Sequence, residues 1–317
     1  MDCNRRKFIK GVAATAALLP VSNLMASVGS GGKSKKYPIF FFTKPLDEFD
    51  SGFMAETLAL AGVDGFDLSV RPGGRVEPKQ VGEGLPKMIE LGKKHKLVTE
   101  MMVTAIKDTT DPYAEEVLKV AAQNGIKHYR LGYYDYDYKK GVMESLADIK
   151  IKMDRLALLN QKLGIQAGYQ NHSGTKVGAP MWDVWELLRS ISPEFVSSQF
   201  DIRHAVTEGN ASWIVSMNLL KKNIGSLAIK DFTWGISGRK AKVVSVPLGE
   251  GIIDFDLFFK TIKELNIIAP ITLHAEYPLL GSEEEKLPLL KKQQLIVSKL
   301  KKDVDFIRTN LVKYELI

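Results

Sequence analysis

Phe195-Val-Ser-Ser-Gln-Phe-Asp-Ile-Arg-His204 contains the repeating unit that decides the fold. Residues 195–200 have the length and composition of a buried strand, and a polar cluster follows them at once. A helical pattern comes next. Strand, polar cluster and helix in this order are typical of chains whose strands pair in parallel.

Seven further runs of strand length lie along the chain, each followed by a helical pattern. Within residues 143–163, apolar side chains recur at spacings of three and four, which predicts a helix. Gly62, Gly125 and Gly164 stand where helices should end. Eight steps predict a single-domain α/β protein, a (β/α)8 TIM barrel over residues 37–317. The seven runs are residues 39–43, 65–70, 97–104, 126–132, 165–169, 226–230 and 270–274.

An open, doubly wound sheet is the alternative fold. It would be expected to carry a glycine-rich loop that cradles phosphate, and the nearest match, Gly249-Glu-Gly251, is too short and follows no strand directly. The same observation argues against a nucleotide cofactor.

The first 26 residues predict a twin-arginine signal peptide. Asn4-Arg-Arg-Lys-Phe-Ile-Lys10 precedes an apolar stretch, residues 11–19, that is too short to span a bilayer. We therefore expect export to the periplasm. Leu24 and Met25 are large for a cleavage site, so an uncleaved membrane anchor stays open. Residues 27–36, rich in Gly, Ser and Lys, predict a flexible linker.

Charge and cysteine content exclude several functions. The formal charge is +7, but residues 1–26 contribute +3 and the linker another +3, which leaves about +1 for the barrel. A nearly neutral body has no electrostatic footprint for nucleic acid. The one cysteine, Cys3, lies in the predicted signal. Disulfides and thiolate catalysis are therefore not expected in the mature protein.

Polar clusters stand at the ends of four predicted strands. They are Gln170-Asn-His172, Asp201-Ile-Arg-His204, Lys230-Asp231 and His274-Ala-Glu276. The C-terminal strand ends of a barrel converge on one mouth. We therefore expect one pocket that contains all four clusters.

These clusters resemble the xylose isomerase-like barrels, the sugar phosphate isomerase/epimerase group. The order of Asn-His, Asp-x-x-His, Lys-Asp and His-x-Glu on strands five to eight carries the resemblance, together with Arg71-Pro-Gly-Gly74 and Pro247-Leu-Gly-Glu-Gly251. The resemblance implies proton transfer between neighbouring carbons of a sugar. It also implies a divalent metal held by Glu, Asp, His and Glu on those strands.

Two of the four implied metal ligands are replaced. Asp201 and Glu276 match, but Gln170 stands in place of the first Glu and Ala228 in place of the His. Glutamine is neutral and cannot be a base, and alanine offers no ligand. A Mn, Mg or Zn ion bound by Asp201 and Glu276, with help from His172 or His204, and a metal-free site are both open.

We expect Glu276 to be the catalytic base and Lys230 to stabilise negative charge on the substrate in place of the metal. A structural ion pair of Glu276 with Lys230, or of Lys230 with Asp231, is the alternative. On an extended chain Asp201 and Arg203 would share a face, with His204 on the following loop. Glu100 in the third strand would need a partner such as Arg130. The predicted substrate contacts are Gln170, His172, Arg203, His204, Arg71 and Trp234, and the tyrosine-rich residues 133–138 would also line the mouth.

The predicted activity is isomerisation or epimerisation of a sugar or keto sugar through proton abstraction next to a carbonyl. A lyase or dehydratase on a keto sugar is the neighbouring possibility, because the same enolate can expel a leaving group. A non-catalytic carbohydrate-binding barrel is an alternative from another class. The expected partner is a small, unphosphorylated carbohydrate, and too few histidines disfavour a three-zinc apurinic endonuclease. The sequence does not indicate an oligomeric state.

Overall fold

The computed structural model describes residues 36–317. The predicted signal peptide, and the predicted linker except for Lys36, lie outside these residues. Within the described part, no helix combines the length and the apolar character needed to cross a membrane.

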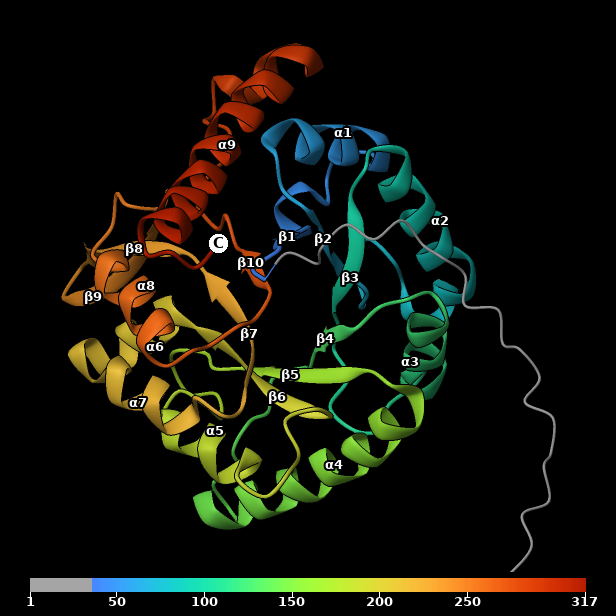
Figure 1. Cartoon of the computed structure of the whole chain (residues 1–317), viewed down its shortest axis with the longest axis vertical. Coiled ribbons are helices and arrows are strands. Elements are labelled where there is room, and N and C mark those ends of the chain that lie inside the picture. The colour runs from blue at the N-terminus through green and yellow to red at the C-terminus, as the bar shows by residue number, and fades with distance from the viewer. Residues whose placement is uncertain (1–35) are drawn as a thin grey trace, which may run out of the picture. The chain divides into compact units, whose positions relative to one another are not determined.

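Eight parallel strands close into a barrel in the order β1-β10-β7-β6-β5-β4-β3-β2. Helices surround this ring of strands (Figure 1), which confirms the predicted TIM barrel. Every predicted run overlaps one barrel strand, with ends that differ by at most two residues. The barrel strands are β1 (Ile39–Phe42), β2 (Gly65–Ser69), β3 (Val98–Val103), β4 (His128–Arg130), β5 (Gln166–Gln170), β6 (Val196–Asp201), β7 (Ile224–Ile229) and β10 (Ile271–Leu273).

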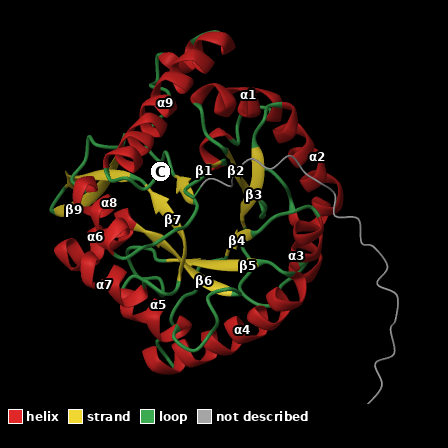
Figure 2. Ribbon diagram, viewed as in Figure 1, coloured by secondary structure: helices red, strands yellow, loops and turns green. Residues whose placement is uncertain are grey.

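Nine α-helices of the described residues connect and cover the strands (Figure 2). Helix α4 matches the predicted pattern and ends at Gly164, whose φ of 68° is a left-handed conformation that glycine adopts without strain. Gly62 ends α1 in the same way, with φ 84°. The helices are α1 (Ser51–Ala61), α2 (Val81–Lys94), α3 (Ala114–Gln123), α4 (Val142–Leu163), α5 (Met181–Leu188), α6 (Ile202–Gly209), α7 (Trp213–Leu220), α8 (Phe255–Glu264) and α9 (Leu289–Lys313).

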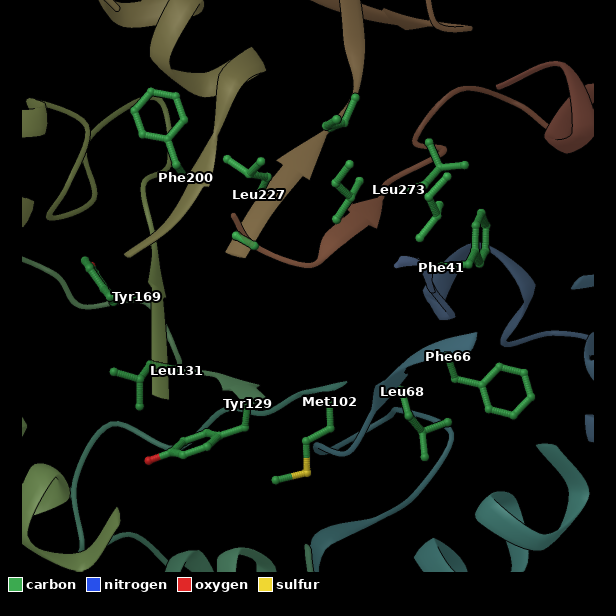
Figure 3. Close-up of a cluster of buried hydrophobic side chains, with 14 of the residues drawn as sticks. Phe41, Phe66, Leu68, Met102, Tyr129, Leu131, Tyr169, Phe200, Leu227 and Leu273 are labelled. Carbon is green, nitrogen blue, oxygen red and sulfur yellow. The ribbon is translucent and has the colours of Figure 1, made fainter. Parts of the chain in front are cut away.

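The main hydrophobic core lies between the strands and the helices. Figure 3 shows outward-pointing side chains such as Phe66, Tyr129 and Phe200, all buried. Successive residues of a strand point to opposite faces, so their neighbours point into the barrel. Several of these inward residues are polar and fully or almost fully buried, among them Asp67 and Arg130. This polar interior leads to the site at the mouth.

An antiparallel hairpin interrupts the alternation of strands and helices after β7. Strands β8 (Asp231–Ser237) and β9 (Lys240–Val246) pair along their whole length, and Gly238 in the turn has φ 63°. The prediction passed directly from the seventh strand to a helix and was wrong here. The prediction missed the hairpin because its strands are largely exposed and lack the buried apolar run that marks the barrel strands. The side chain of Ile236, for example, is 86% exposed.

Candidate active site

The ends of four strands bring Gln170, Asp201, Lys230 and Glu276 into one hydrogen-bonded chain. Nε2 of Gln170 donates to Oδ2 of Asp201 at 2.7 Å. Nζ of Lys230 lies 3.1 Å from that same carboxylate oxygen and donates to Oε1 of Glu276 at 2.9 Å. Residues far apart in sequence therefore meet at the C-terminal mouth, as barrel geometry requires.

Lys230 forms no ion pair with its neighbour Asp231. The Asp231 carboxylate instead accepts hydrogen bonds from the backbone N–H groups of Gly249 and Gly251, at 3.0 and 2.9 Å. A Cβ atom on Gly251 would lie only 2.1 Å from Oδ1 of Asp231. The Asp231 side chain thus anchors the loop after the hairpin, which leaves Lys230 free to face the barrel axis.

Asp201 is the N-cap of helix α6, and this corrects the expected geometry of its neighbours. Its Oδ1 accepts a hydrogen bond from the backbone N–H of His204 at 3.1 Å. Aspartate favours this position because it satisfies an N–H that the first helical turn leaves unpaired. Arg203 and His204 therefore lie on the first turn of α6, and not on an extended chain and a loop. From there Arg203 donates to Oε2 of Glu276 at 2.8 Å.

The residues present do not fit the four-ligand metal site that the resemblance implies. Gln170 and Ala228 replace two ligands, and Nζ of Lys230 lies between the remaining carboxylates. A cation shared by Asp201 and Glu276 would have to displace this ammonium. Over residues 36–317 no group of three or more His, Cys, Asp or Glu side chains is arranged to hold a metal ion.

Glu276 is the accessible carboxylate of the pair. Its side chain is 33% exposed, whereas that of Asp201 is completely buried. Burial acts to raise the pKa of Glu276, but nearby His274, Lys230 and Arg203 together hold this pKa well below its usual range. Glu276 is therefore ionised throughout the neutral range. Asp201, by contrast, reaches no solvent and forms a buried ion pair with Lys230.

Three histidines border this cluster without carrying charge at pH 7. Burial lowers the pKa of His274 to about 4, and its Nδ1 lies 3.7 Å from Oε1 of Glu276. Burial and the charge of Lys230 also lower the pKa values of His172 and His204. The rings of these two lie 4.1 Å apart. His172 and His204 are therefore uncharged aromatic neighbours of the Lys230 ammonium.

Arg130 and Tyr133 complete the site, and the first was not among the predicted site residues. Nη1 of Arg130 donates to Oε1 of Gln170 at 2.8 Å, and the Tyr133 hydroxyl donates to the same oxygen. The expected pair of Glu100 with Arg130 is wrong, since Glu100 pairs with Lys127 at 2.6 Å. Arg130 could have been found from its place at the end of β4, where inward side chains reach the mouth.

Two other predicted contacts, Arg71 and Trp234, make no hydrogen bond or ion pair with the Lys230 cluster among the described residues. The Arg71 guanidinium carbon lies 5.6 Å from the ring centre of Phe42. Trp234 is 49% exposed on β8 and packs edge-on against Phe232. No contact among the described residues joins Trp234 to the cluster, so its role in binding stays a prediction.

A cavity of about 540 Å³ opens beside Glu276. Phe42 and Ala275 to Leu280 form much of its wall, and the exposed side chains of Lys44 and Glu48 stand at it. Of the four residues in the hydrogen-bonded chain, Glu276 alone lines this space. A small ligand in the cavity would therefore reach this hydrogen-bonded chain through Glu276.

A closed parallel barrel with ionisable groups gathered at its C-terminal mouth defines a class of proteins whose members are very often enzymes. The xylose isomerase-like TIM barrel family model matches residues 56–293. The chain belongs to this family. A comparison with curated protein sequences gave no match.

Solved structures show the same fold at low sequence identity. D-allulose 3-epimerase from Methylomonas sp. is 18% identical, with a TM-score of 0.62, and the alignment covers 87% of this chain and 99% of that one. 3-Keto-D-glucoside 4-epimerase from E. coli is 12% identical, with a TM-score of 0.62, and the alignment covers 86% of this chain and 99% of that one. A candidate 3-DHS dehydratase from Bacillus anthracis is 13% identical, with a TM-score of 0.58, and the alignment covers 84% of this chain and 97% of that one. At these identities the likeness establishes the fold.

Proposed function

We propose that this protein is an isomerase or epimerase that moves a proton on the carbon next to the carbonyl of a keto sugar. The single observation that carries the proposal is the position of Lys230, whose ammonium is held between buried Asp201 and cavity-facing Glu276. A base and a fixed positive charge side by side are what enolate formation requires.

Glu276 is the proposed base. It is ionised at neutral pH and reaches the cavity. Its depressed pKa makes it a weak base while Lys230 and Arg203 hold both of its oxygens. When Lys230 and Arg203 also donate to a substrate oxygen, part of their charge is used there, their hold on Glu276 weakens and its basicity rises as the enolate forms.

Lys230 is the proposed electrophilic group. An ammonium has three N–H donors, and Asp201 and Glu276 account for two of them. The third can donate to the substrate carbonyl oxygen and stabilise the charge that develops there. Because Asp201 fixes the ammonium in advance, little reorganisation is needed during the reaction. No step of this mechanism passes through a metal ion.

The proposed substrate is a small carbohydrate with a carbonyl group. The similar structures include epimerases that, by their names, act on D-allulose and on a 3-keto-D-glucoside, and the family model points to the same class of barrel. We further propose export by the twin-arginine route to the periplasm, on the evidence of Arg5-Arg6 and the apolar stretch after them. Export would favour an unphosphorylated substrate, and an uncleaved signal would act as an anchor.

A dehydratase is the second candidate function. The similarity to the candidate 3-DHS dehydratase favours it, and the chemistry begins alike. Once Glu276 has removed the proton, the enolate either regains a proton on carbon or expels a hydroxyl group at the next carbon. The two outcomes differ in product mass, because only dehydration loses water.

Solvent-deuterium exchange tests the proposal. Purified protein is incubated in D2O with a panel of ketohexoses and 3-ketoglucosides, and the products are analysed by NMR and mass spectrometry. We expect deuterium on the carbon next to the carbonyl with wild-type protein and almost none with Glu276→Gln. Glu48→Gln is the matched control, since it removes a carboxylate from the same cavity wall. If several sugars bind but none of the panel incorporates deuterium, the result would favour the carbohydrate-binding alternative.

A further inference from the structure

Two arginines share one aromatic ring at the edge of the proposed active site. The guanidinium carbons of Arg71 and Arg130 lie 5.6 and 5.7 Å from the ring centre of Phe42. They follow β2 and end β4 in the N-terminal half of the barrel, with β3 between these two strands. Phe42 also lines the cavity beside Glu276 and packs against His274, so the arginine pair lies behind a ring that forms part of the cavity wall.

Among residues 36–317 neither guanidinium has a carboxylate within ion-pair distance, although Asp47 and Asp67 act on Arg71 from farther away. Arg71 makes no hydrogen bond through its guanidinium to the described part of the chain. Arg130 is only 6% exposed, bonds through Nη1 to the neutral groups of Gln170 and Tyr133, and keeps a buried Nε without any partner. Burying an arginine without an anionic partner is costly.

The charges of the mouth confirm this imbalance. Lys230 and Arg203 are neutralised by Asp201 and Glu276. Asp67 interacts electrostatically with both arginines, is fully buried and accepts a hydrogen bond from Thr272, and burial raises its pKa to about 6. Asp47 lies 3.6 Å from another arginine, Arg75. Asp47 and Asp67 therefore offset the charge of the arginine pair only from beyond ion-pair distance.

We propose that Arg71 and Arg130 form a subsite for an anionic group of the substrate, a carboxylate or a phosphate, so that the preferred substrate is an acidic sugar. Guanidinium groups bind such groups through paired, charge-assisted hydrogen bonds. Gln170 links the two ends of the site: its Oε1 accepts from Arg130 and its Nε2 donates to Asp201. An acid group held by the arginines would place the remaining carbons toward Lys230 and Glu276.

The inference rests on the proposed function only for the position of the reacting carbons, so it is tested by binding. Isothermal titration calorimetry of the full chain compares D-glucuronate, D-glucose 6-phosphate and D-glucose. We expect at least one acidic sugar to bind roughly tenfold or more tightly than glucose, as bonds to charged groups warrant. Tighter glucuronate identifies a carboxylate subsite, and tighter glucose 6-phosphate a phosphate subsite.

Three variants locate the effect. Arg71→Met should abolish the preference for the acidic sugar, and Arg189→Met, which removes a remote arginine paired with Glu186, should leave it unchanged. Asp67→Asn should strengthen acidic binding, because it removes the competing negative charge without removing an arginine. Circular dichroism checks that each variant is folded.

Two results would overturn the subsite: acidic sugars that bind no more tightly than glucose, or a preference that Arg71→Met leaves intact. Deuterium exchange gives an independent answer on the function. Exchange of neutral sugars alone would retain the proposed function and remove the subsite. Tight binding of an acidic sugar without deuterium exchange in any sugar would retain the subsite and remove the proposed function.

Discussion

Nζ of Lys230 lies 2.9 Å from Oε1 of Glu276, across 46 residues of sequence. The family resemblance alone would place a metal ion between strand-end carboxylates, and the structure places a side-chain ammonium there. A positive charge covalently attached to the barrel cannot dissociate, and it brings its own hydrogen-bond donors. The following predictions depend on this contact and its surroundings.

Glu276→Gln should lower turnover by about 10²–10⁴-fold, the usual contribution of a general base. The amide keeps the shape of the side chain, so substrate affinity should survive. Initial rates and calorimetry on the same protein separate the two effects. A double variant with Lys230→Met should lose less than the sum of the single losses, because both groups serve one step. Full activity in both single variants would refute the mechanism.

Lys230→Met should also destabilise the fold. It leaves the completely buried Asp201 carboxylate without its cation, and breaking a buried pair in this way costs about 3–5 kcal/mol. Adding Asp201→Asn should restore part of the loss, since the unpaired charge is then gone. Urea unfolding followed by circular dichroism measures each variant. Equal stability of wild type and Lys230→Met would show that Asp201 does not depend on Lys230.

Chelation should leave the activity unchanged, because Lys230 occupies the place between Asp201 and Glu276. The protein is dialysed against EDTA, assayed, and analysed for Mn, Mg and Zn. A variant that carries Gln170→Glu, Ala228→His and Lys230→Met should gain affinity for Mn²⁺, because it restores four ligands and removes the ammonium. Activity that EDTA abolishes and Mn²⁺ restores in the wild type would contradict this expectation.

Asp67→Asn should stabilise the protein above about pH 6. Burial raises the pKa of Asp67 from 3.8 to about 6, so the folded state holds this proton more tightly than the unfolded state. Wild-type stability is therefore lost as the pH rises from about 4 to 6, by on the order of 3 kcal/mol. Asparagine carries no such cost. Unfolding at pH 3.5 and pH 7.5 should show a difference between variant and wild type only at the higher pH.

Replacing Arg5 and Arg6 by lysine should keep the precursor in the cytoplasm if export uses the twin-arginine route. Fractionation of cells, with detection of the barrel by antibody, measures the distribution. Lys33→Arg and Lys35→Arg form the control, because they alter basic residues outside the signal. Unchanged export of the Arg5 and Arg6 variant would reject this route.

The order of the strands was predictable because burial imposes a pattern on sequence. Strands covered on both faces by the barrel interior and the helices appear as short continuous runs, and the glycines at 62 and 164 end helices in a conformation that suits glycine. The hairpin β8–β9 was not predictable in this way. Its exposed strands carry no such pattern, and it separates residues 247–251 from β7 in sequence although Gly249 and Gly251 bind Asp231 just after that strand.

The candidate residues were predictable only as strand-end polar groups. Asp201, Lys230 and Glu276 stood out because polar residues directly follow buried runs. Arg130 did not, because its strand was read through to residue 132 and the arginine therefore fell inside it. The N-cap geometry of Asp201 was likewise hidden, since the sequence does not say at which residue the strand gives way to the helix.

The sequence by itself determined that eight strand ends would face one mouth, because a one-dimensional pattern of burial and helix ends is enough to specify a repeated β/α unit. Only the tertiary structure decided which polar groups pair there. Lys230 could have paired with adjacent Asp231, but the Asp231 carboxylate instead accepts hydrogen bonds from the backbone N–H groups of residues 249 and 251. Partner choice among charged groups depends on distances between segments remote in sequence, and closure of the barrel fixes those distances.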